Sequence, residues 1–369
     1  MLKTLEPVFS EDAITVFFST SEKFAPFCSA AILSLLDHMN QERYYDIIIL
    51  DSGMKQSTKE LYQQLFNCYE NASIRFFPVM EILSGYNLAT SRHFVVDCYS
   101  RLLIPYILPD YKKAIYLDGD MILMSDIAEL FDYDISEVSI GALRVLGFAA
   151  ALFGGFKKIK QKVTDYFSNV LHISEENWDK YFTTGTLLMN LERMREKYPS
   201  YKQVFEYADE NSHKFWYLDV DVLNTLYQGD VFLLSQTWGW LAFDKDDTVW
   251  WEPICLTPRC LYEEYTSASV NPQIIHYGGP DKPWDFPNRM RAEEFWRVFR
   301  RTPFYGSYLE KRILGDASYK DVNQLQKKIE ELQVSEAALL SWMNRVRFSM
   351  PYRLMRRLRK VFRKGVRND

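Results

Sequence analysis

The first third of the chain alternates short apolar runs with segments of helical periodicity. Buried strands are predicted at 13–18, 45–50 and 74–78, because each is an apolar run bounded by polar turns. Amphipathic helices are predicted at 27–38 and 59–69, where apolar residues recur every three or four positions. This alternation is typical of a parallel α/β sheet covered by helices, which binds ligands outside the carboxyl ends of its strands.

The next apolar run, 114–117, leads into two carboxylates one residue apart, Asp118 and Asp120, before apolar character resumes. Ionised carboxylates at the end of a buried strand cost several kcal/mol unless a cation or hydrogen-bond donors compensate them. A hard divalent metal is their natural partner, and Gly119 between them lets the backbone approach a ligand closely. The alternative interpretation is a polar strand end followed by an ordinary acidic turn.

Two later segments combine polar residues with predicted element ends. A strand is predicted at 181–191, and Asp219 starts a helix whose first-turn acids are also explained by helix capping. A second apolar run ends at His276 in front of a Gly-Gly-Pro turn, and Lys282 follows six residues later. Neutral imidazole is a ligand for Mn²⁺, and exposed amides with a lysine suit a diphosphate, although a single histidine is otherwise often structural.

Two further features each have two interpretations. Residues 147–155 are rich in Gly, Ala and Phe and precede four lysines, which favours a mobile flap over the site; a surface loop and a hydrophobic helix are the alternatives. Arg101 lies towards the end of a helix predicted to begin near Arg92, and it is either a site residue or an ordinary surface cation.

The composition indicates a large globular protein, with 369 residues of which 47% are hydrophobic and 25% charged. The five cysteines contain no Cys-x-x-Cys pair, so we expect neither a disulfide framework nor a zinc cluster, and a reducing cytosol. The sequence has no apolar signal region and no run of about 18 apolar residues, so we expect neither secretion nor a membrane span.

The charge is unevenly distributed. The net charge is -5, but residues 345–369 contain ten Arg or Lys and one acid, which leaves -14 for the rest. Apolar residues alternate with these cations, which predicts a basic amphipathic helix that docks on an anionic membrane surface. Nucleic acid is the rival partner, but it is not expected because no other part of the chain is basic. Helices are also predicted at 291–301 and 322–344.

In this order, these blocks resemble glycosyltransferase family 8, the retaining nucleotide-sugar transferases that include bacterial lipopolysaccharide galactosyl- and glucosyltransferases. The resemblance covers residues 14–284, and its strongest pieces are Tyr-Leu-Asp-Gly-Asp-Met-Ile at 116–122 and His-Tyr-Gly-Gly-Pro-Asp-Lys-Pro-Trp at 276–284. It implies a GT-A fold, a Rossmann-like mixed sheet flanked by helices, over residues 1–288, with a helical C-terminal region at 289–369.

The resemblance also implies an activity and a set of site residues. The expected reaction transfers galactose or glucose from a UDP-hexose to a saccharide, glycolipid or glycoprotein, with Mn²⁺ or Mg²⁺ held by Asp118, Asp120 and His276. The residues expected to contact the nucleotide sugar are Ser19, Thr20, Ser21, Phe24, Arg101, Asp118, Gly119, Thr183, Asp219, Gly279 and Lys282. Among them Asp219, Arg101 and Lys282 are expected to be catalytic, the first two at the sugar hydroxyls and Lys282, with Gly279, at the diphosphate.

Three positions depart from the family pattern. Ser21 lies in a turn where an acid that reads uracil is usual, Thr183 replaces an asparagine, and Val220 replaces the glutamine of many members. A valine cannot act as a nucleophile. We therefore expect the acceptor to attack from the face that the leaving group departs from, with a diphosphate oxygen accepting its proton.

The sequence is also compatible with two other classes of protein. An aspartate-based phosphohydrolase would use Asp118 as nucleophile and Asp120 as acid, although that motif normally lies near the start of a domain. A sugar-binding pseudoenzyme is suggested by Ser21, Thr183 and Val220. The expected location is cytoplasmic, peripheral on the inner face of the cell membrane.

Overall fold

The computed structural model describes residues 2–9, 13–90, 96–154, 157–243 and 254–316. Backbone contacts divide the chain into a compact unit that ends at Tyr305 and a second unit that begins at Gly306. The predicted boundary at residue 288 stays a prediction. The predicted helix at 322–344 and the basic segment at 345–369 lie outside the described residues.

The elements follow the order expected from the sequence. The strands are β1 (Ile14–Thr20), β2 (Tyr45–Asp51), β3 (Ala72–Pro78), β4 (Lys113–Leu117), β5 (Met121–Leu123), β6 (Ile140–Arg144), β7 (Phe182–Asn190), β8 (Val231–Leu233), β9 (Trp240–Leu241) and β10 (Ile274–His276). The α-helices are α1 (Ala25–His38), α2 (Gln56–Phe66), α3 (Met80–Leu83), α4 (Ile104–Ile107), α5 (Ala128–Phe131), α6 (Leu146–Phe153), α7 (Lys157–Asn169), α8 (Leu191–Lys197), α9 (Tyr201–Asn211), α10 (Asp219–Leu226), α12 (Arg259–Ala268), α13 (Ala292–Phe299) and α14 (Tyr305–Asp316). The 3-10 helices in the described ranges are η1 (Val96–Leu103), η2 (Glu175–Lys180), η3 (Ser212–Lys214) and η4 (Gln236–Gly239).

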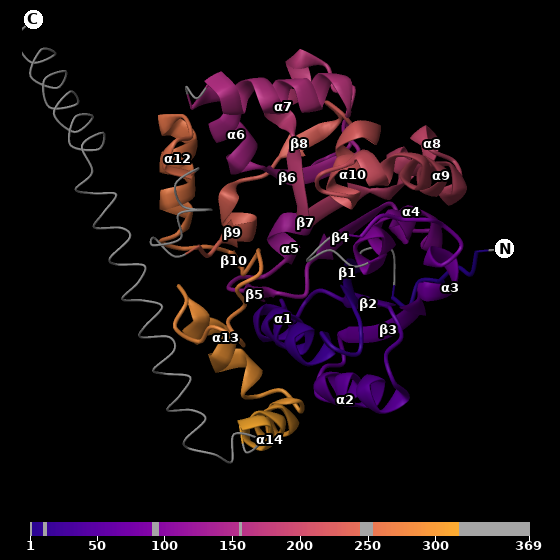
Figure 1. The fold of residues 1–369 in the computed structure, drawn as a ribbon. Coiled ribbons are helices and arrows are strands. Elements are labelled where there is room, and N and C mark those ends of the chain that lie inside the picture. Colours follow the sequence, from indigo (N-terminus) through magenta and orange to yellow (C-terminus); the bar gives the residue numbers. More distant parts are fainter. Residues whose placement is uncertain (1, 10–12, 91–95, 155–156, 244–253, 317–369) are drawn as a thin grey trace, which may run out of the picture. The chain divides into compact units, whose positions relative to one another are not determined.

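The larger sheet has seven strands in the order β3-β2-β1-β4-β7-β6-β8. Strands β1 to β4 are parallel, whereas β7 runs antiparallel to both of its neighbours, β4 and β6. Figure 1 shows α1 and α2 on one side of strands β1 to β3 and α4 on the other. The predicted fold class, a mixed α/β sheet flanked by helices, is confirmed.

The order of the strands reverses beside β1. The chain moves outward from β1 to β3 and then returns to place β4 on the opposite side of β1. In open α/β sheets, ligands bind outside the carboxyl ends of the strands at such a reversal. The acidic pair that follows β4 is therefore located where this class of sheet forms its binding crevice.

A second sheet has three strands in the order β5-β10-β9. Strand β10 pairs antiparallel with β5, and this register sets His276 opposite Met121. Because Met121 follows Asp120 directly, the small sheet brings the histidine to the acidic turn from a segment more than 150 residues away in the sequence.

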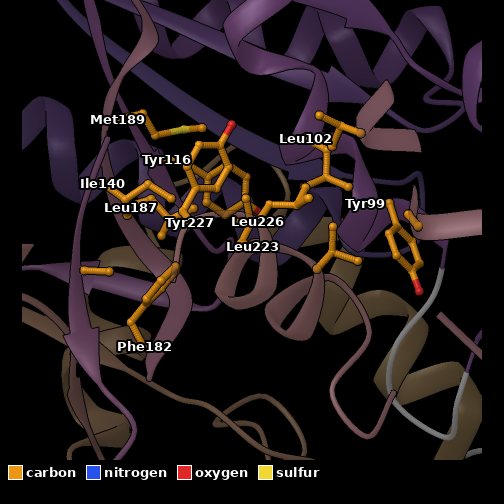
Figure 2. Close-up of a cluster of buried hydrophobic side chains, with 14 of the residues drawn as sticks. Tyr99, Leu102, Tyr116, Ile140, Phe182, Leu187, Met189, Leu223, Leu226 and Tyr227 are labelled. Carbon is orange, nitrogen blue, oxygen red and sulfur yellow. The ribbon is translucent and has the colours of Figure 1, made fainter. Parts of the chain in front are cut away.

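The strands beside the reversal are buried on both faces, which explains their continuous apolar runs. Figure 2 shows part of this core, where Tyr116 of β4 lies among side chains from β7 and α10 such as Leu187 and Leu223. The acidic end of β4 is thus supported by a packed apolar base.

A buried ion pair lies near the amino-terminal ends of the strands. Asp46 at the start of β2 is fully buried, and Arg75 of β3 donates to both of its carboxylate oxygens. Ser73 and Tyr111 donate to the same carboxylate at 2.8 and 2.9 Å. One cation and two hydroxyls therefore compensate this carboxylate without a ligand.

One prediction was wrong in its local structure. The segment predicted as a mobile flap forms α6, whose Phe148, Ala149 and Leu152 are buried, because a helix that is apolar on all sides packs into the core. The hydrophobic-helix alternative was correct. The segment that carries Arg101 is a 3-10 helix, η1, and the predicted start near Arg92 lies outside the described residues.

The cysteines, all of which are within the described ranges, are free, as predicted. Among the described helices, none has both the length and the apolar character that a membrane span requires.

Candidate active site

The acidic turn is fixed at the carboxyl end of β4 by its neighbours on both sides. Phe18 of β1 pairs with Leu117 of β4, so Asp118, which follows β4, lies beside the last residues of β1. The amide of Asp118 donates to the carbonyl of Gly185 in β7 at 2.9 Å. The turn is therefore held between one parallel and one antiparallel strand.

Three potential metal ligands converge at this turn. The ligand atoms of Asp118, Asp120 and His276 all lie within 4.8 Å of one another. His276 Nε2 is 3.2 Å from Asp120 Oδ1 and 3.7 Å from Asp118 Oδ2. The Asp118 side chain is 28% exposed, so the cluster is open to a ligand on one side. Two carboxylates and an imidazole form a donor set that suits Mn²⁺.

Gly185 allows this convergence. A Cβ atom at this position would lie 2.6 Å from His276 Cε1 and 3.0 Å from Asp118 Oδ2. Real Cβ atoms essentially never make a contact as short as 2.6 Å, so a side chain at position 185 would displace His276, and the 3.0 Å contact would also crowd Asp118. The cluster therefore requires a glycine at position 185 of β7. The space that this glycine leaves for His276 and Asp118 is the observation that supports a metal at this site.

Lys282 is also part of the cluster. Its ammonium group donates to Asp120 Oδ2 and to the carbonyl of Tyr277 at 2.9 Å. Burial alone would raise the pKa of Asp120, but Lys282 and His276 outweigh burial and hold that pKa well below its usual range. Asp120 is therefore ionised and paired with the cationic side chain of Lys282.

Arg101 connects the metal cluster with Asp219. Its Nη2 donates to Asp118 Oδ1 at 3.1 Å, and its Nε lies 3.2 Å from Asp219 Oδ2. The guanidinium also donates to the carbonyl of Thr184 and lies 4.2 Å from the centre of the Tyr116 ring. Arg101 is only 5% exposed, so it is a buried bridge between two carboxylates and not a surface cation.

Asp219 is presented by an unusual turn. The residue before it, Leu218, has φ of 49° and ψ of -112°, a region that non-glycine residues rarely adopt. Asp219 is buried and accepts a hydrogen bond from the hydroxyl of Thr184 at 3.2 Å. Burial raises the pKa of Asp219, while Arg101 opposes this effect. The strained turn places the carboxylate at the buried guanidinium.

The residues expected to contact the nucleoside are at the end of β1, where Ser19 and Thr20 lie, and in its connection to α1, which contains Ser21 and Phe24. Ser19 Oγ donates to the carbonyl of Asp97 at 3.3 Å and accepts from Ser100 Oγ at 2.9 Å. Thr20 is buried, whereas Phe24 is 39% exposed at the start of α1. This connection begins beside Asp118, so an exposed aromatic ring and several hydroxyls lie near the strand reversal.

The acid beside Ser21 has another partner. Glu22 accepts hydrogen bonds from the amide of Lys55 at 2.9 Å and from Thr58 Oγ1 at 3.1 Å. Because α2 has no side-chain cap of its own, Glu22 supplies the missing acceptor at its amino terminus. Glu22 is thus engaged in the fold, and Ser21 remains the polar side chain at the expected base-reading position.

The remaining positions singled out in the sequence are two glycines in turns and two residues near Asp219 and Gly185. Gly119 packs against α1, where a Cβ would lie 3.0 Å from Cys28 Cβ, so close packing and not only ligand approach requires this glycine. Gly279 has φ of 79°, as the turn after β10 demands. Strand alternation sets Thr183 on the same face of β7 as Gly185. Val220 is partly buried against the core.

The sequence interpretation missed three residues of the site: Tyr116, Thr184 and Gly185. Tyr116 donates to Asp118 Oδ1 at 3.0 Å from two positions earlier in the strand, and this spacing could have indicated a shared face. The roles of Thr184 and Gly185 depend on the pairing of β7 with β4, which no local pattern reveals.

Comparison with known proteins identifies the class that this fold and site define. The model of Glycosyl transferase family 8 matches residues 15–287, and the chain belongs to that family. General stress protein A of Bacillus subtilis (strain 168) is 25% identical over 289 residues, which are 74% of this chain and 88% of that protein. The chain is therefore a glycosyltransferase, and the phosphohydrolase alternative is excluded.

Solved structures show the same fold. The WbbM bifunctional glycosyltransferase has a TM-score of 0.71 at 23% identity, covering 84% of this chain and 53% of the other, so this chain spans about half of it. The galactosyltransferase LgtC, in complex with donor and acceptor sugar analogs, has a TM-score of 0.62 at 20% identity, covering 79% of this chain and 96% of the other.

The requirement for glycine at position 185 gives a first prediction. Gly185→Ala is expected to weaken Mn²⁺ binding about tenfold or more, because the added Cβ displaces His276 and Asp118. The matched control is Gly147→Ala in α6, where a Cβ would meet nothing within 4 Å. Calorimetric Mn²⁺ titration of both variants, with circular dichroism to verify folding, measures the difference. Equal Mn²⁺ affinity in the two folded variants would contradict the proposed ligand set.

Proposed function

We propose that this glycosyltransferase moves a hexose, galactose or glucose, from a UDP-sugar to a saccharide, glycolipid or glycoprotein acceptor with retention of configuration. The observation that carries the proposal is the convergence of Asp118, Asp120 and His276 at the strand reversal. Such a site suits a nucleoside diphosphate because its two phosphates carry negative charge that a bound cation offsets.

The proposal assigns the cation to these three residues. A bound Mn²⁺ or Mg²⁺ would act as a Lewis acid for the diphosphate of the donor. Asp118 is oriented for this role by donors from Arg101 and Tyr116, both of which bind its Oδ1 and leave Oδ2 directed to His276. The protein thus fixes the geometry of one ligand before the cation arrives.

The remaining residues are assigned by their position. Ser19, Thr20, Ser21 and Phe24 would contact the nucleoside, Gly119 and Thr183 would line the site between nucleoside and sugar, and Gly279 would offer its amide to the diphosphate. Asp219 would accept hydrogen bonds from sugar hydroxyls, with Arg101 holding it in place. The ammonium of Lys282 would leave Asp120 and pair with the diphosphate, where negative charge grows as the glycosyl bond breaks.

The proposed chemical step needs no nucleophile from the protein. The bond between the anomeric carbon and the diphosphate oxygen breaks, and the oxygen of the acceptor hydroxyl bonds to the same carbon from the same face. The hydroxyl proton passes to the departing diphosphate oxygen. The sugar is oxocarbenium-like between these events, as in other glycosyl transfers. Val220, partly buried and without a nucleophilic atom, is consistent with this course.

The proposed function has a direct test that also separates an active enzyme from a sugar-binding pseudoenzyme. The purified full chain is incubated with a panel of UDP- and other nucleotide sugars and Mn²⁺, and nucleotide release to water is measured. We expect turnover of UDP-galactose or UDP-glucose that ceases in excess chelator, and loss of both Mn²⁺ binding and turnover in Asp120→Ala. Undiminished turnover in chelator would overturn the metal assignment, and no release from any donor would favour the pseudoenzyme.

Lys282 and Val220 offer contrasting variants. Lys282→Ala is expected to reduce turnover by roughly 10²-fold or more, because it removes the cation that stabilises the leaving group. Its Mn²⁺ affinity is not expected to fall, because the lysine competes with the metal for Asp120. Val220→Ala is expected to reduce turnover only modestly. Mass spectrometry that detects a glycosyl adduct on any side chain would contradict the front-face course.

The basic segment at 345–369 is the reason for proposing where in the cell the enzyme acts. We propose that it docks the enzyme on the anionic inner face of the cell membrane, in the cytoplasm, near a membrane-linked acceptor. Each of its ten cations contributes about 1 kcal/mol near an anionic surface. Truncation before Arg345 should release the protein from vesicles of anionic phospholipid at low salt without loss of UDP-sugar hydrolysis. Equal vesicle binding by the truncated and full-length chains would refute the docking role.

A further inference from the structure

Two large aromatic side chains are exposed immediately before Asp219. Trp216 is 39% exposed and Tyr217 is 37% exposed, although most aromatic residues of the compact unit lie in its core. Exposed aromatic rings beside a binding site are typical of surfaces that bind a ligand with an apolar face. The catalytic assignments above do not use either ring.

The two rings are held rigidly by the fold. The Trp216 indole stacks on Tyr166 of α7 with ring centroids 3.7 Å apart and an interplanar angle of 3°. Tyr217 meets Phe148 of α6 edge-on, with centroids 5.5 Å apart. One indole face is thus covered by a buried tyrosine, while the side chain as a whole remains accessible.

A buried carboxylate fixes the backbone of the same pair. Asp221 is fully buried and accepts hydrogen bonds from Tyr166 at 2.7 Å, from Tyr181 at 2.5 Å and from the amide of Tyr217 at 2.6 Å. The Tyr166 hydroxyl in turn accepts from the amide of Trp216 at 2.7 Å. Because these groups are ordered without a ligand, little conformational entropy is lost when one binds.

The platform lies within reach of the reacting centre. Trp216 precedes Asp219 by three residues, so their Cα atoms are at most about 10 Å apart. Asp219 contacts Arg101, which contacts Asp118. The backbone that carries the indole therefore lies within the length of a short oligosaccharide of Asp219.

We propose that Trp216 and Tyr217 form the acceptor subsite and bind a pyranose ring of a saccharide acceptor. The inference rests on the proposed function. The C–H face of a pyranose is apolar and packs on an aromatic ring, whereas its rim carries hydroxyl groups. The ammonium of Lys162 lies over the Trp216 ring, 5.3 Å from its centre, so this side chain has to move aside for a pyranose and can then donate to one of its hydroxyls. The subsite selects pyranosides as acceptors and orients them towards Asp219.

The experiment compares Trp216→Ala and Trp216→Phe with the control Phe232→Ala. Phe232 is an equally exposed aromatic residue, 43%, on the edge strand β8. The probes are the methyl β-glycosides of glucose, galactose and N-acetylglucosamine, and binding to the full chain with UDP and Mn²⁺ is measured by saturation-transfer NMR. UDP-hexose hydrolysis by water is measured in parallel.

At least one glycoside is expected to bind the wild type, with the strongest saturation on the protons of one pyranose face. Trp216→Ala should weaken this binding about fivefold to tenfold, as loss of an aromatic contact does. The factor by which glycoside affinity falls should exceed the factor by which the rate of UDP-hexose hydrolysis falls by at least about threefold. Trp216→Phe should retain most of the affinity because it keeps an aromatic face, and Phe232→Ala should match the wild type.

Three results would overturn the inference: no glycoside binds the wild type, glycoside binding in Trp216→Ala equals that of the wild type, or binding and hydrolysis fall equally in Trp216→Ala. The last would show that the indole only supports Asp219. Failure of the wild type to hydrolyse any UDP-hexose would instead contradict the proposed function, so the two failures are distinguishable.

Discussion

The site depends on how the fold compensates three neighbouring carboxylates. Asp118, Asp120 and Asp219 face two cationic side chains, Arg101 and Lys282. The three carboxylates outnumber the two cationic side chains in a partly buried space. At the other end of the sheet Asp46 has a cation of its own and needs nothing further. The excess of negative charge is therefore found at the site and not at Asp46, and a cation bound from solution would relieve it.

The two cations in this arrangement differ in kind. Arg101 is buried, makes contacts to four surrounding groups and holds Asp118 and Asp219 in a fixed relation. Lys282 lies on the turn after β10, is 19% exposed and pairs with the carboxylate that a metal would bind. A rigid guanidinium that orients and a flexible ammonium that can move to the leaving group match the ordinary physical properties of these side chains.

The sequence predicted the parts of this site that depend on short-range patterns. The apolar run before Asp118, the strand that ends at His276 and the Gly-rich turn before Lys282 were all visible as local features. The contribution of Gly185 was not, because it arises only when β7 pairs antiparallel with β4. The sequence favours a flap where the structure has α6, since a run of Gly, Ala and Phe has no period that distinguishes a loop from a buried helix. The sequence does not predict a role for Trp216, because its stack on Tyr166 is a contact between residues 50 positions apart.

We propose that Asp118, Asp120 and His276 bind a divalent cation together with the donor diphosphate. Anomalous diffraction from crystals soaked with Mn²⁺ and UDP would locate this cation. We expect one strong manganese peak within coordination distance of these three side chains, with the Lys282 ammonium moved from Asp120 to the diphosphate. A manganese peak elsewhere, or Lys282 still paired with Asp120 while UDP is bound, would contradict it.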